Sequence, residues 1–143
     1  MTIKSFRGRM ADGDQITIRL STNDGKTGYM IKKFQMMPTE PGENQVESTF
    51  KIYSVPPDAI DNSVNFDDPL LLGVGYLQSY AGTAYAGWDT VIFDHVKINQ
   101  DIFITHVDSN GTEPCNFYLE LEQVKLSVDE AAVATLKDMR GTN

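Results

Sequence analysis

The feature that most constrains the fold of this chain is a set of short segments in which apolar and polar residues alternate. In residues 15–20, QITIRL, the apolar residues Ile16, Ile18 and Leu20 fall on one side. The same period of two recurs in residues 46–55, VESTFKIYSV, and in residues 116–126, NFYLELEQVKL. This period is typical of a β-strand with one face in the core and the other in solvent. The chain is therefore predicted to be built from half-buried strands.

Four more segments, residues 29–37, 70–80, 90–98 and 101–107, also read as strands, separated by stretches rich in Asn, Asp, Gly and Pro. The turn residues in 21–28 predict a hairpin between residues 15–20 and 29–37. Residues 56–69 are predicted to form a crossing loop at one end of the fold. Gly73 and Gly75 indicate a bend or a close backbone approach, and the phase change at Val124 and Leu126 indicates a bulge.

The chain ends in one predicted helix, residues 127–141. Ser127 and Glu130 have the spacing of a capping box, and a packing face is predicted at helical spacing: Val128, Ala132, Leu136 and Met139. About eight strands closed by one short helix predict an all-β, antiparallel, jelly-roll-like β-sandwich. Residues 1–126 are expected to form the sandwich, and residues 127–143 a helix and tail within the same unit.

Composition narrows the function classes. The chain has 143 residues, with 12 basic and 20 acidic residues and a net charge of −8. Such a charge would repel a phosphate backbone, so no nucleic-acid partner is expected. No apolar run approaches the ~18 residues of a membrane span, and no leader is recognised, so a soluble protein made in the cytosol is expected.

The rare reactive residues gather in residues 93–117, which hold His95, His106 and the only cysteine, Cys115. Residues 88–98 and 101–107 are predicted to form a hairpin around residues 99 and 100, with His106 on an apolar face of a central strand. A shared metal would need both histidines on one face and a third ligand, so hydrogen-bonded structural histidines are favoured over a metal or catalytic site. Acidic neighbours also argue against a nucleophilic Cys115, because a nucleophile needs an electropositive setting.

Acidic turns leave a second possibility open. Oxygen-rich turns at Asp108, Asn110 and Glu113, and at Asp67 and Asp68, would suit a structural cation, or are simply solvated. Phosphate-loop, zinc-protease and hydrolase motifs are absent from the sequence. No catalytic residue, metal or cofactor is therefore predicted, and the chain is expected not to be an enzyme.

Four aromatic residues, Tyr76, Tyr80, Tyr85 and Trp88, fall within thirteen positions among glycine and alanine. They suit three roles: rings that cap one end of the core, a protein interface, or a platform on which sugar rings stack. They are the candidate interface or glycan residues of this chain.

Three segments resemble a group of small β-rich proteins encoded by marine tailed bacteriophages: residues 15–37, QITIRLSTNDGKTGYMIKKFQMM; residues 90–106, TVIFDHVKINQDIFITH; and residues 116–141, NFYLELEQVKLSVDEAAVATLKDMRG. The resemblance implies a virion structural protein, made in the host cytoplasm and bound to other capsid or tail subunits, with a homo-oligomer expected. It carries over no functional residues. The alternative hypothesis is a module that binds host-surface glycan through Tyr80, Tyr85 and Trp88.

Overall fold

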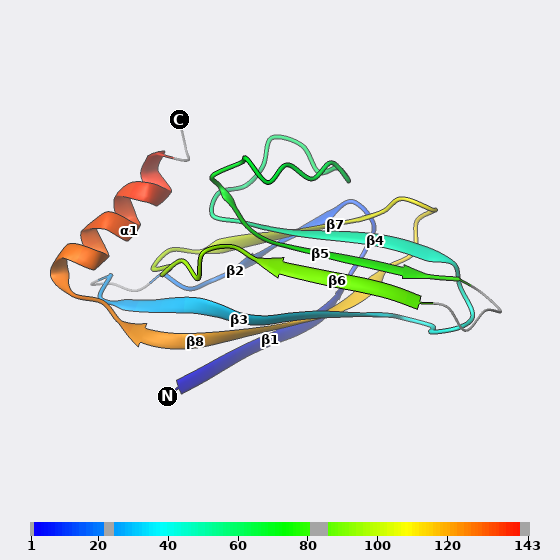
Figure 1. Cartoon of the computed structure of the whole chain (residues 1–143), viewed down its shortest axis with the longest axis horizontal. Coiled ribbons are helices and arrows are strands. Elements are labelled where there is room, and N and C mark those ends of the chain that lie inside the picture. Colours follow the sequence, from blue (N-terminus) through cyan, green and yellow to red (C-terminus); the bar gives the residue numbers. More distant parts are fainter. Residues whose placement is uncertain (1, 22–24, 81–85, 141–143) are drawn as a thin grey trace.

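The computed structural model describes residues 2–21, 25–80 and 86–140, and it consists of two antiparallel β-sheets with one helix beyond their end (Figure 1). The elements are β1 (Thr2–Met10), β2 (Asp14–Ile18), β3 (Thr27–Pro38), β4 (Val46–Tyr53), β5 (Leu71–Ser79), β6 (Ala86–Ile92), β7 (Ile102–Asp108), β8 (Cys115–Lys125) and α1 (Val128–Arg140). The smaller sheet has the order β1-β8-β3 and the larger sheet β2-β7-β4-β5-β6. The predicted all-β sandwich with about eight strands and a short C-terminal helix is confirmed.

Three strand pairs are nested as they would be in a jelly roll: β1 pairs with β8, β2 with β7 and β4 with β5. The fourth pair of that pattern, β3 with β6, does not form, because these strands belong to different sheets. The predicted hairpin between residues 15–20 and 29–37 is wrong, because β2 and β3 belong to different sheets. The strand β6 pairs with β5 at the edge of the larger sheet, while β3 forms one edge of the smaller sheet. The sandwich is therefore left open along the side where β3 and β6 lie.

The core lies between the two sheets and is made of the apolar side chains that alternate toward the inside of each strand. Phe34 of β3 packs edge-on against Phe50 of β4 at 5.6 Å and stacks on Phe117 of β8 at 6.2 Å. Gly75 lets these strands approach, because a β-carbon there would lie 2.6 Å from the sulfur of Met36. The close approach at this glycine is made by the side chains of Met36 and Phe34 rather than by another backbone.

The predicted hairpin of residues 88–98 and 101–107 is also wrong. The strand β6 ends at Ile92, and Asp94 and His95 follow with φ values of 56° and 45°. This left-handed region is unfavourable in a strand, so the chain leaves the sheet there. The next strand, β7, lies between β2 and β4, three places along from β6. His106 does sit in an interior strand, as predicted, but His95 lies in an irregular segment.

The bulge and the helix are partly as predicted. The register shift in the smaller sheet falls in β3, between Ile31 and Lys33, rather than in the last strand. The capping box is confirmed by reciprocal hydrogen bonds: the Ser127 N–H donates to Glu130 Oε1 at 3.2 Å, and the Glu130 N–H to Ser127 Oγ at 3.1 Å. The predicted packing face is wrong where its side chains are described, since Val128 is 70% exposed, whereas Ala131 is buried.

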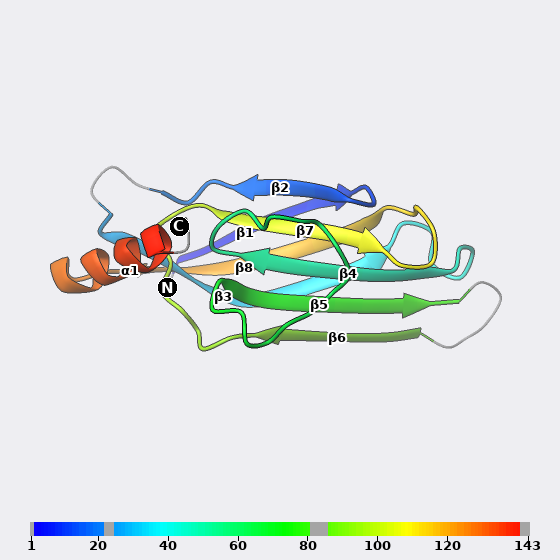
Figure 2. The same ribbon diagram turned by 90° about the horizontal axis from the view of Figure 1, so that it is seen from above.

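The long segment 54–70 is not a crossing loop between sheets. It joins β4 and β5, which are hydrogen-bonded neighbours, and it folds back across the outer face of the larger sheet (Figure 2). This cover explains why Lys51 and Tyr53, on the outward face of β4, are buried. In the described part of the chain, no helix is long and apolar enough to cross a membrane.

Candidate functional site

The structure separates the four aromatic candidates. Tyr76 pairs with Asp89 across β5 and β6, while Trp88 pairs with Leu77, the next residue along β5. Because side chains alternate along a strand, Tyr76 points to the outer face of the larger sheet and Trp88 to the opposite face. Tyr80 accepts a hydrogen bond from the Gln78 amide just beyond the end of β5, and Tyr85 lies outside the described residues. The described rings therefore do not form a single platform.

Trp88 belongs to a groove along the open side of the sandwich. This cavity of about 870 Å³ runs past β3 and the inner face of β6, and its apolar lining includes Phe34, Met36, Met37 and Ile92. Trp88 is 72% exposed and Met37 is 61% exposed, although both are large apolar side chains. Exposed apolar surface at a groove is typical of a place where another molecule binds.

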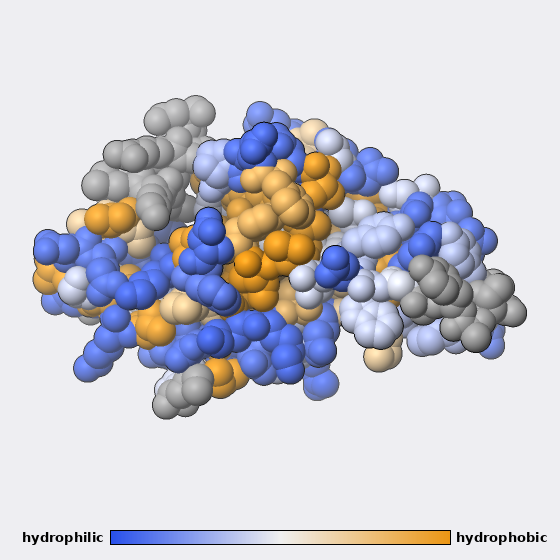
Figure 3. Space-filling model, in the orientation of Figure 1, coloured by the Kyte–Doolittle hydropathy of each residue, from blue (hydrophilic) through white to orange (hydrophobic). Residues whose placement is uncertain are grey.

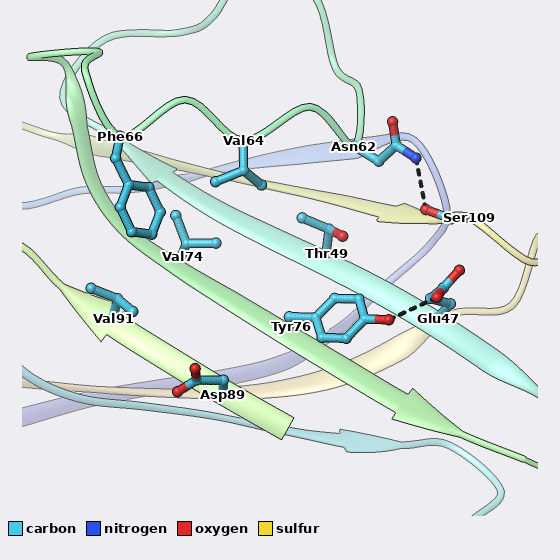
Figure 4. Close-up of a pocket in the computed structure, with 10 residues that line it drawn as sticks. All are labelled: Glu47, Thr49, Asn62, Val64, Phe66, Val74, Tyr76, Asp89, Val91 and Ser109. Atoms are coloured by element: carbon cyan, nitrogen blue, oxygen red, sulfur yellow. Dashed lines mark hydrogen bonds between the residues drawn. The ribbon is translucent and has the colours of Figure 1, made fainter. Parts of the chain in front are cut away.

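Tyr76 belongs to a second cavity, of about 410 Å³, on the outer face (Figure 4). Its floor is built from two cross-strand rows: Thr49, Tyr76 and Asp89 form one, and Val74 and Val91 lie in the next. We call this cavity the outer pocket. Figure 3 shows apolar residues gathered on this face, between the segment that covers β4 and β5 and the strand β6.

The wall of the outer pocket comes from the 54–70 segment, through Asn62, Val64 and Phe66. Phe66 rests edge-on against Phe93, with ring centres 4.8 Å apart. The Asn62 amide donates to the Ser109 hydroxyl at 2.9 Å, which ties the wall to the far rim (Figure 4). The wall is thus fixed at both ends by named contacts.

A buried lysine holds this segment against the sheet. Lys51 is only 2% exposed, and its ammonium donates to Asp61 Oδ1 at 2.8 Å and to the Ser63 carbonyl at 2.7 Å. The hydrogen bond from Lys51 lowers the pKa of Asp61. An ammonium so deeply buried is stable only when paired and hydrogen-bonded, so the segment and the lysine stabilise each other. Irregular segments of this length are uncommon in compact domains unless they serve a function.

Two carboxylates stand at the two ends of the Tyr76 side chain. The Tyr76 hydroxyl donates to Glu47 Oε1 at 2.7 Å, and Asp89 is the direct cross-strand neighbour of Tyr76. Among the residues that the structure describes, the ion pairs involve other carboxylates, those of Glu122, Asp61 and Glu130. The outer pocket therefore carries negative charge that no described cation neutralises.

His106 and Cys115 have structural surroundings. The two ring nitrogens of His106 lie 3.1 Å from the Ala11 carbonyl and 3.0 Å from Ser48 Oγ, and its ring stacks on Phe50 at 4.5 Å. Burial lowers the pKa of His106. Burial also raises the pKa of Cys115 to about 11. Each setting favours the uncharged side chain, which suits the interpretation as core residues.

The carboxylates of the acidic turns accept hydrogen bonds from backbone N–H groups of nearby turns and strands. Asp108 accepts hydrogen bonds from the N–H groups of Glu47, Asn110 and Glu113, at 2.8 to 3.1 Å, and the Leu70 N–H donates to Asp68 at 2.9 Å. No group of three or more His, Cys, Asp or Glu residues that would suit a metal ion occurs within the described ranges.

No protein-family model matches this chain, and no curated protein matches it either.

Sequence reasoning did not identify the wall and the carboxylates of the outer pocket. Glu47 looked like an ordinary polar residue of one predicted strand, and Asp89 stood beside another that is far away in the sequence, with no face assigned to it. One local feature could have helped: Val64 and Phe66 are the apolar pair in an otherwise polar stretch, 61–68. Such a pair needs a surface to contact, and here that surface is the outer face of the sheet.

Proposed function

We propose that this chain is a non-enzymatic structural component of a bacteriophage virion, either a capsid decoration or minor capsid protein or a tail-associated one. It acts by assembling with other protein subunits, copies of itself included. The observation that carries the proposal is the apolar groove along the open side of the sandwich, with Trp88 and Met37 exposed in it. Tryptophan is among the residues most enriched at the energetic centres of protein interfaces.

Strand edges support assembly as well, although part of the β3 edge is already occupied, because Tyr29 exchanges two backbone hydrogen bonds with Ile98. The strands β3 and β6 end their sheets on the groove side, and β1 ends the smaller sheet on the other side. An unpaired edge presents N–H and C=O groups that a strand of another chain can pair with. A partner that lay in the groove would gain both apolar contact and backbone hydrogen bonds.

Light scattering with a mass estimate tests assembly directly. We expect the protein to form trimers or larger species as its concentration rises, and Trp88→Ala to weaken this association. The matched control is Val133→Ala, which removes an exposed apolar side chain from α1, away from the groove. A protein that remains monomeric at high concentration overturns self-assembly, and its absence from purified particles of the phage that encodes it overturns the virion assignment.

The second candidate function is glycan binding at a host surface, which the solvent exposure of Trp88 favours, because an exposed indole face can stack on a sugar ring. A glycan array separates the two functions. Binding of a defined glycan that is lost in Trp88→Ala, by a protein that remains monomeric, would replace the structural proposal with this one.

A further inference from the structure

We propose that the outer pocket receives an arginine side chain presented by a neighbouring protein subunit. The proposal that this subunit belongs to a virion rests on the proposed function, whereas the chemistry of the pocket does not. The groove and the outer pocket lie on opposite faces of β5 and β6, so they can hold different partners.

The shape and lining of the pocket suit a side chain with an aliphatic stem and a polar head. Val64, Val74 and Val91 line its apolar part, and Phe66 stands beside them (Figure 4). Thr49, Asn62 and Ser109 supply hydrogen-bonding groups toward the other part. A volume of about 410 Å³ is near the lower limit of small-molecule sites, which fits one side chain and its stem.

The charges indicate a cation. Glu47 and Asp89 lie at the two ends of the Tyr76 side chain, and neither forms an ion pair with a described residue. The hydroxyl of Tyr76 occupies Oε1 of Glu47, which leaves Oε2 able to accept another donor. A ligand that covers this ring removes water from both carboxylates, and burying a carboxylate is unfavourable unless an opposite charge compensates it.

Arginine suits this arrangement better than lysine or a neutral sugar. A guanidinium group is planar, stacks on an aromatic face and offers five N–H donors in a fixed fork, so it can cover Tyr76 while donating toward Glu47 and Asp89. An ammonium is a compact point charge that reaches one carboxylate well. A neutral sugar would supply hydroxyl donors but no charge, and it would leave both carboxylates uncompensated.

The pocket is also formed before any ligand arrives. Lys51, held by Asp61 and the Ser63 carbonyl, keeps the wall in place, and the bond between Asn62 and Ser109 closes one end. Preformed sites lose less conformational entropy on binding.

The test uses methyl NMR of the full chain, titrated with the blocked tripeptide acetyl-Gly-Arg-Gly-amide. We expect shifts at Val64, Val74 and Val91, with a dissociation constant on the order of 1 mM that rises with added salt. The same peptide with citrulline, which is nearly isosteric and neutral, should give much smaller shifts. Asp89→Asn and Glu47→Gln should each weaken binding about threefold. Val133→Ala, which removes an exposed apolar side chain of α1 far from the outer pocket, should leave binding unchanged.

Three results would overturn the proposal: equal shifts with the citrulline peptide, no shifts at the three valines, or shifts with methyl glucoside in place of the arginine peptide. The last would move the glycan hypothesis to this pocket. The outcomes separate the two proposals, since arginine binding by a protein absent from phage particles rejects only the virion assignment. Assembly without arginine binding rejects only the pocket.

Discussion

Gly75→Ala should destabilise the protein, although replacing glycine by alanine in a strand usually helps. At a compatible position the change would stabilise the fold by about 0.4–1 kcal/mol, because alanine loses less backbone entropy on folding. Here the added methyl carbon would lie 2.6 Å from the sulfur of Met36, and 3.0 Å from both Met36 Cε and Phe34 Cε2. Favourable contacts of this kind lie at about 3.5–4.0 Å, so several atoms must move.

Met36 can move, because it is only half buried and its side chain is flexible. Phe34 cannot do so easily, since it packs on both Phe50 and Phe117. Overpacking of this kind costs about 1–3 kcal/mol, so we expect a net loss of about 1–2 kcal/mol after the gain from alanine.

Urea unfolding of four proteins measures this effect: the wild type, Gly75→Ala, Met36→Ala and the double variant. Because Met36 moves easily and Phe34 does not, removing the Met36 side chain should relieve little of the loss, so the two single losses should add in the double variant to within about 0.5 kcal/mol. Gly111→Ala is the matched control, because its new methyl group would be 3.7 Å from the nearest atom, Asp108 Oδ2. A Gly75→Ala protein as stable as the wild type would contradict the predicted overpacking. A double variant at least ~1 kcal/mol more stable than the added losses would show that Met36, rather than Phe34, sets the cost.

Three further predictions concern buried polar groups. His106 is neutral in the fold and has a lowered pKa, while the unfolded chain protonates it below about pH 6.5. Stability should therefore fall as the pH drops from about 6.5 toward the folded pKa, by at most ~1.4 kcal/mol per pH unit. His106→Gln should flatten this part of a urea-unfolding series, and an unchanged slope would count against the mechanism. Cys115 has a pKa raised to about 11 and no exposed surface. Its thiol should therefore resist Ellman's reagent at pH 8, about three units below that pKa, until urea unfolds the chain. Equal labelling rates in the folded and the unfolded protein would contradict this. Lys51→Met keeps the stem but removes both hydrogen bonds to the 54–70 segment, so amide exchange there should accelerate while exchange in β8 stays slow. Unchanged exchange in the segment would show that Lys51 does not anchor it.

The fold class could be predicted from the sequence because the period of two is a local property. Leu119 and Leu121 point into the core as the alternation requires, and Ser127 caps its helix through a residue only three positions away. The strand β1 has no counterpart among the predicted strands, because it is an exposed edge in which only Met10 is buried. Pairing with β8, more than a hundred residues later, organises it.

Strand pairing and the outer pocket could not be predicted because both depend on contacts between distant parts of the chain. The alternation placed His106 on an apolar face, but its partners Ala11 and Ser48 are 95 and 58 residues away. Pairing strands that are consecutive in the sequence gives two hairpins that the structure does not contain, since β2 and β3 lie in different sheets and β6 and β7 are not neighbours. For the same reason Glu47 and Asp89 appeared unrelated until β5 brought β4 and β6 together.

The alternation of side chains along a strand also explains how one pair of strands, β5 and β6, contributes to two surfaces. Along β5 and β6, Tyr76 and Asp89 point into the outer pocket, while Leu77 and Trp88 point into the groove. As the outermost strand of the larger sheet, β6 pairs with β5 alone among the described strands. A partner in the groove that fixes β6 would therefore also fix Asp89, and a ligand on Asp89 would restrain Trp88. Because such coupling is reciprocal, each site is expected to favour binding at the other.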